Sequence, residues 1–250
     1  MSLPSLMLRV IATKALLGNT FCEDRVLDSP LDPVDVIEKG ATITIYTGES
    51  HAKPTDKSLM DVEWKIDFSI HMHLPASVQV AIGNVNTRNG GGEMLFDVLW
   101  RQILKSLYLL DNKWAQLWRE AIISIDSLQA RPFMVELDKG VRIPAREVIF
   151  AAQTLIEPPF GPVDPASWWG RVIALLDVDT DPDMVSLGQL LRAETEGVSN
   201  VSAAASLRAY LGLSDEEYAG IGLASLSPPL TPLVHINVAT VGDGSVNIVS

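Results

Sequence analysis

Thirteen consecutive residues, 62–74, alternate strictly between apolar and polar side chains. The apolar members are Val62, Trp64, Ile66, Phe68, Ile70, Met72 and Leu74. Because successive side chains of a strand point to opposite faces, this pattern predicts one long strand with a buried face and a wet face. A parallel sheet covered by helices on both faces would instead read as a continuous apolar run. The segment therefore favours a mixed, largely antiparallel sheet.

The other periodic segments complete an α/β (α+β) fold in which helices flank this sheet. They are an amphipathic helix over 3–17, a strand over 41–47, a helix over 93–109, a second helix capped by Asp111 and carrying Trp114 to Ile125, a hairpin over 132–143 that turns at 138–140, and a strand over 145–156. We expect the two central helices to pack on the apolar face of the sheet. Residues 21–40 are expected to be a polar connection, and residues 48–61 an exposed loop.

Charge is unevenly distributed along the 250 residues, whose net charge is −12. Residues 151–250 carry −9, and residues 1–150 carry only −3. Prolines at 158, 159 and 162 interrupt the chain where this change begins. We therefore expect an α/β domain over 1–160 and an acidic, mainly helical extension over 161–250, with helices over 166–176 and 183–193. An acidic chain repels phosphate backbones, which argues against sequence-specific nucleic-acid binding.

Composition indicates a soluble protein made in the cytoplasm. Apolar residues make up 47% of the chain, enough for a sizeable core, and no stretch approaches the roughly 20 apolar residues that span a bilayer. Arg9 and Lys14 interrupt the first apolar stripe, so we interpret it as a helix of the fold and not as a signal peptide. The single cysteine, Cys22, fits a reducing compartment and is interpreted as a buried small residue.

Residues able to carry chemistry are few. His71 and His73 share the polar face of the long strand, about 7 Å apart, which suits two ligands of one metal ion. No further histidine or cysteine has a ligand-like spacing to them, so a metal-dependent enzyme is kept only as an alternative. The run of aspartates at 177–183 lacks the glycine and final glutamate of a calcium loop, and is interpreted as a linker and helix cap. We expect no catalytic residue, no cofactor and no bound metal.

Two segments are candidate contacts with other proteins. Trp168 and Trp169 are neighbours on an expected helix and cannot both face inward, so the pair is a candidate interface hot spot. Residues 83–92 contain four glycines and three asparagines, which predicts a long turn or mobile loop. Within it, Thr87, Arg88 and Asn89 are candidate contact residues.

The order of these segments resembles that of the tail terminator and tail completion proteins of long-tailed bacteriophages. The resemblance covers about residues 3–160 and consists of several matches in sequence. They are LRVIATKALLGNT, DRVLDSPLDP, TITIYTGE, WKIDFSIHMHL, EMLFDVLWRQILKSLYL and IPAREVIFAAQTLIEPP. The extension after Pro162 is a departure, because small members of the family lack it.

The resemblance implies a structural virion protein at the joint between tail and neck. Such a protein forms a homo-oligomeric ring, typically a hexamer, that caps the tail tube, ends its polymerisation and presents a surface to the neck or head–tail connector proteins. Loops such as 83–92 would then point into or along the ring. Two alternatives remain open: another neck or completion protein with the same core, and a binding module unrelated to phages.

Overall fold

A computed structural model of the protein describes residues 2–30, 37, 39–54, 62–75, 91–136, 142–196, 207–214 and 217. The chain divides into two compact units, Met1–Leu175 and Leu176–Ser250. The division falls inside a helix, later than the proline-rich segment at which the sequence suggested a boundary. The two units are described separately below.

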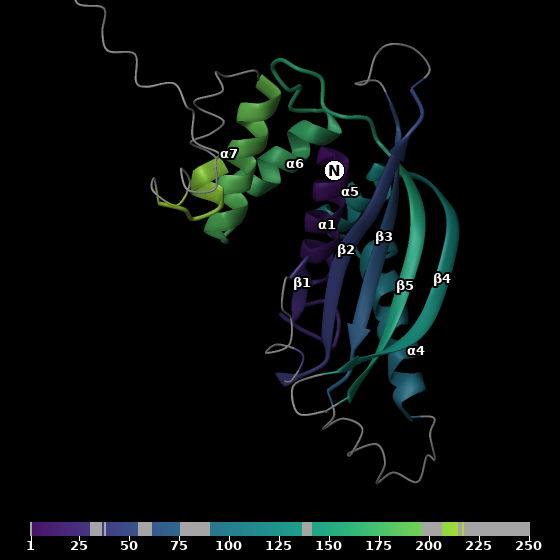
Figure 1. Ribbon diagram of the computed structural model, residues 1–250. Coiled ribbons are helices and arrows are strands. Elements are labelled where there is room, and N and C mark those ends of the chain that lie inside the picture. Colours follow the sequence, from purple (N-terminus) through teal and green to yellow (C-terminus); the bar gives the residue numbers. More distant parts are fainter. Residues whose placement is uncertain are drawn as a thin grey trace, which may run out of the picture. The chain divides into compact units, whose positions relative to one another are not determined.

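Unit 1 contains a five-stranded mixed sheet with the strand order β1-β2-β3-β5-β4 (Figure 1). Its strands are β1 (Val26–Asp28), β2 (Thr42–Ala52), β3 (Trp64–His73), β4 (Ile122–Glu136) and β5 (Arg142–Thr154). Only β1 and β2 are parallel, and every other pair is antiparallel. The predicted mixed, largely antiparallel sheet flanked by helices is confirmed.

The period-two pattern of β3 places its apolar side chains on the helix-covered face of the sheet. Ile66, Phe68, Ile70 and Met72 are fully buried. The Phe68 ring lies 5.1 Å from the Trp118 ring of α5 (Lys113–Ala121) and 5.1 Å from the Phe150 ring of β5. Each such side chain contributes about 1.5–3 kcal/mol by leaving water, so this layer holds the sheet against its helices.

Three helices of unit 1 gather on this face: α1 (Leu3–Leu16), α4 (Gly91–Tyr108) and α5 (Figure 1). Helix α1 begins with the Ser2 side chain accepting a hydrogen bond from the Ser5 N–H. It ends before Gly18, whose φ of +69° suits glycine. Arg9 of α1 also forms an ion pair of 2.9 Å with Asp28, which joins the helix to β1.

Four details differ from the sequence-based expectations. Helix α5 ends at Ala121, so Ile122 and Ile125 lie on β4 and not on the helix, as their β-branched side chains favour. Its N-cap is Asn112 and not Asp111, because the Asn112 side chain accepts from the Trp114 N–H at 2.8 Å. β2 continues to Ala52 through a bulge between Thr47 and Ser50, and β1 lies within the expected connection.

Helix α6 (Trp168–Asp177) begins in unit 1 and ends in unit 2, where α7 (Pro182–Glu196) follows. Both helices were expected from the proline near each start. Ser214 and Glu217 have the spacing of a capping box and form one, with the Glu217 N–H donating to the Ser214 hydroxyl at 3.2 Å. The alternation of Val234, Ile236 and Val238 predicts a further strand, which lies outside the described residues. Within the described ranges, no helix is long and apolar enough to cross a membrane.

Candidate assembly site

β4 is an edge strand, because among the described strands it pairs with β5 alone. It runs for 15 residues, and most of its side chains are exposed. Four large apolar ones are 42–57% exposed, and we call them the β4 surface: Ile123, Ile125, Leu128 and Met134. Soluble monomers seldom leave a long apolar edge strand uncovered, so this surface is a candidate contact site.

Three features of β4 limit hydrogen bonding along its free edge. The register shifts twice, between Ile122 and Ser124 and between Ile125 and Ser127. Pro132 lacks an N–H and sits on this outer strand, as proline in sheets usually does. Bulges and edge prolines hinder the addition of a further strand. A partner would therefore contact the β4 surface mainly through side chains.

The sequence contains a signal for the start of β4, but the apolar spacing there also fits the end of a helix, which is what the sequence predicts. Ile122, Ile123 and Ile125 follow the α5 sequence without a break, and their spacing continues its apolar stripe. Their β-branching is the feature that favours a strand. Polar residues between them, such as Ser124 and Ser127, fit the alternation of an edge strand.

His71 and His73 lie on the sheet face opposite the helices, within a cluster of aromatic rings. The His71 ring centroid is 4.9 Å from that of Tyr46 and 5.3 Å from that of Phe133. The His73 centroid is 5.9 Å from that of Phe133 and 6.2 Å from that of His71. The expectation of a wet face is wrong at this end of β3, because His73 is only 3% exposed.

Burial sets the protonation of both imidazoles. Burial is the main cause, and the neighbouring His71 the second, that together lower the pKa of His73 to about 4. Nε2 of His73 lies 3.2 Å from the Thr44 hydroxyl, and its buried Nδ1 has no hydrogen-bond partner. Burial also lowers the pKa of His71, although Glu147, with an oxygen 3.1 Å from Nε2, acts in the opposite direction. Both rings are therefore neutral near pH 7.

The geometry around these histidines does not assemble a metal centre. Among the described residues, no three His, Cys, Asp or Glu side chains are placed to hold one ion. Glu147 is already shared between His71 and Arg131. The cluster is thus a packed, neutral part of the sheet.

An open hollow of about 530 Å³ lies at the other end of β3, lined by residues that include Lys65, Glu63, Asp126 and Gln153. These four polar side chains are paired with one another. Lys65 Nζ lies 2.8 Å from an Asp126 oxygen, and the Gln153 amide donates to Glu63. These four side chains are therefore not free to bind a small ligand.

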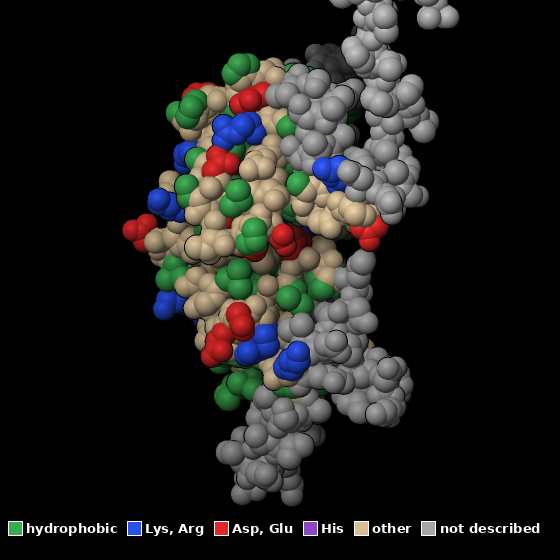
Figure 2. Space-filling view, turned by 90° about the vertical axis from the view of Figure 1, so that its left-hand side faces the viewer, with side chains coloured by type: hydrophobic (Ala, Val, Ile, Leu, Met, Phe, Trp, Pro, Cys, Tyr) green, Lys and Arg blue, Asp and Glu red, His purple; other side chains and the backbone are tan. Residues whose placement is uncertain are grey.

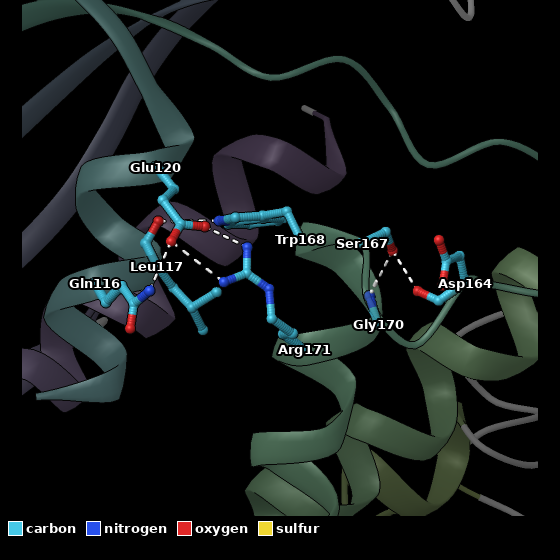
Figure 3. A network of polar contacts seen from close by, with 8 residues as sticks. All are labelled: Gln116, Leu117, Glu120, Asp164, Ser167, Trp168, Gly170 and Arg171. Atoms are coloured by element: carbon cyan, nitrogen blue, oxygen red, sulfur yellow. Dashed lines mark hydrogen bonds and ion pairs between the residues drawn. The ribbon is translucent and has the colours of Figure 1, made fainter.

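The tryptophan pair anchors the start of α6 within unit 1, and Figure 3 shows Trp168 beside α5. Trp169 is buried, and Trp168 is half-buried with its indole N–H donating to the Leu117 carbonyl of α5 at 2.9 Å. The two rings meet edge to face, with centroids 4.9 Å apart. The proposed interface role of the pair remains a prediction, and only Trp168 retains exposed surface for it.

An ion pair with α5 and a tight turn also position the start of α6. Arg171 bonds to both carboxylate oxygens of Glu120, and this pairing lowers the pKa of Glu120 (Figure 3). The turn before the helix is tight, since a Cβ on Gly170 would lie 2.2 Å from the Asp164 carbonyl oxygen. These contacts fix the first turns of α6 on the body of unit 1.

The remaining candidates from the sequence have structural roles or lie outside the described residues. Burial raises the pKa of the Cys22 thiol to about 12, so it stays protonated and is a poor nucleophile. In the aspartate run, the Asp183 N–H donates to the Asp181 side chain at 3.1 Å, which confirms a helix cap. Residues 87–89, with Thr87, Arg88 and Asn89, are not among the described residues.

Comparison with known proteins adds no family to this picture. No protein-family model matches the chain, and no curated protein sequence matches it.

Proposed function

We propose that this chain is a structural assembly protein, a phage tail terminator or a related neck component. It forms a ring that caps the tail tube, ends tube growth and presents a surface to the neck proteins. The resemblance in the order of segments supports this role, and so does the mixed sheet with helices on one face. The alternative role of another head–tail completion protein uses the same surfaces.

The observation that carries the proposal is the β4 surface. A 15-residue edge strand with four exposed large apolar side chains provides one side of a subunit contact. Its bulges and Pro132 discourage open-ended strand addition, which suits a closed assembly better than a fibre. On the face drawn in Figure 2, by contrast, hydrophobic side chains are scattered among acidic and basic ones.

The test is the mass of the full chain by light scattering, with negative-stain images of the same fractions. A closed ring of about six copies, formed alone or on adding tail tubes, is the expected result. A chain that stays monomeric with tubes would overturn the proposal. If it also retains one metal ion per copy, the result would point instead to an enzyme that uses His71 and His73.

A further inference from the structure

The outer face of α4 combines apolar and basic side chains. Residues spaced by four, three, four and four positions share this face, opposite the buried Phe96, Leu99 and Ile103. We call this set the α4 stripe: Met94, Val98, Arg101 and Lys105 of α4, and Leu109, which directly follows the helix and donates its N–H to the Lys105 carbonyl. All five side chains are exposed, and Met94, Val98 and Leu109 are 60%, 42% and 73% exposed. The stripe extends over about 22 Å at 1.5 Å per residue.

The positive charge of the stripe is not neutralised within the described part of the chain. Neither Arg101 nor Lys105 has an acidic partner among the described residues. The nearby acids of α4, Glu93 and Asp97, are both bound to Arg146 of β5. A chain of net charge −12 thus presents two unpaired bases between exposed apolar side chains.

Unit 2 has the complementary chemistry. Residues 176–250 contain ten acidic residues and two arginines. Val178, at 76% exposure, stands between Asp177 and Asp179, and the exposed carboxylates of Asp183 and Glu194 lie on α7. Unit 2 thus offers an exposed apolar side chain with acids on both sides. The α4 stripe offers exposed apolar side chains with bases between them, so the two surfaces are complementary in charge and both partly apolar.

We propose that the α4 stripe of one copy binds the acidic unit 2 of the neighbouring copy. This inference rests on the proposed ring and identifies a contact within it. The contact is heterologous, because it joins two different surfaces, and such contacts close into rings when the rotation between copies permits. A stable interface buries roughly 800 Å² per partner, and in the proposed ring the stripe acts together with the β4 surface. Repetition around a ring strengthens a contact that is weak in a single pair.

The experiment uses charge reversal in the full chain, followed by light scattering across a concentration series. The double variant R101E/K105E is expected to raise the concentration needed for half-assembly at least about tenfold, because like charges would face each other. K53E carries the same kind of change at an exposed base away from α4 and should assemble like the wild type. The wild-type ring should also weaken between about 0.05 and 0.5 M salt, as screened contacts do.

Reversal on the other surface provides the matched test. D183K/E194K is expected to assemble as poorly as R101E/K105E, and the chain carrying all four substitutions should regain assembly. If the wild type forms rings and R101E/K105E forms them equally well, this contact is overturned and the proposed ring stands. A wild type that never assembles, with or without tubes, would overturn the proposed function and this contact together. Circular dichroism of each variant separates loss of assembly from loss of folding.

Discussion

At the scale of single residues, burial of His73 makes the stability of the protein depend on pH. The sequence placed His73 correctly on the polar face of β3. It gave no sign that Phe133 of β4 would lie beside the ring, because that contact depends on the β4–β5 hairpin. The period-two pattern of β3 shows which residues share a face, but it does not show that Phe133, from a distant segment, covers that face at His73.

The pKa of His73 predicts that the protein loses stability in mild acid. Its folded pKa of about 4 lies below the value of about 6.5 for an unfolded chain, so the unfolded state takes up the proton first. Stability is full above about pH 6.5 and falls as the pH is lowered toward 4. Between pH 7.5 and 5 the loss from this group is about 2 kcal/mol.

Urea unfolding of the wild type and of His73→Phe at these two pH values measures this loss. The variant is expected to lose about 2 kcal/mol less than the wild type on going from pH 7.5 to 5. His51→Gln is the control, because His51 is exposed and its removal should leave the wild-type pH dependence. An equal loss in wild type and His73→Phe would show that His73 is not the group responsible.

At the scale of elements, the sequence predicted which helices and strands exist better than it predicted where each one begins and ends. β3, β5 and α4 were predicted within a few residues, since each has a clear period. The end of α5 was missed, because Ile122 and Ile125 continue an apolar spacing that either a helix or a strand accepts. The exposed β4 surface was therefore not foreseen, although it supports the proposed assembly most directly.

A charge within the β4 surface is expected to prevent assembly without unfolding the chain. Leu128 is 57% exposed, so Leu128→Glu should change the free energy of unfolding by no more than about 0.5 kcal/mol. Buried in a subunit contact, the same carboxylate would be desolvated without a partner, at a cost of several kcal/mol. Light scattering should therefore show smaller species than the wild type, with an unchanged melting temperature.

Phe160→Glu is the matched control for that variant. Phe160 is 76% exposed and lies outside β4, so the substitution introduces the same charge at another apolar surface position. It should assemble like the wild type. If Leu128→Glu and Phe160→Glu assemble equally well, the β4 surface is not a subunit contact.

At the scale of the whole molecule, the two units divide within α6, and the start of that helix belongs to unit 1. The sequence suggested a break at 160, since prolines and a change of charge occur there. The prolines and the change of charge do not reveal the contacts that the chain makes after residue 160. Trp168 bonds to the Leu117 carbonyl, and Arg171 bonds to Glu120, so the chain returns to α5 after the prolines. Prolines mark a turn of the backbone, whereas a domain boundary also requires that few contacts cross it.

Two truncations distinguish these boundaries. A chain ending at residue 177 keeps the anchor of α6, whereas one ending at residue 160 removes it together with the buried Trp169, Val172 and Ile173. Each of these three side chains contributes about 1.5–3 kcal/mol by burial, so the shorter chain should lose at least about 4 kcal/mol. Its melting temperature should fall by about 10 °C or more relative to the 1–177 chain, as measured by circular dichroism. Equal melting of the two chains would mean that α6 adds nothing to unit 1 and that the domain ends at the prolines.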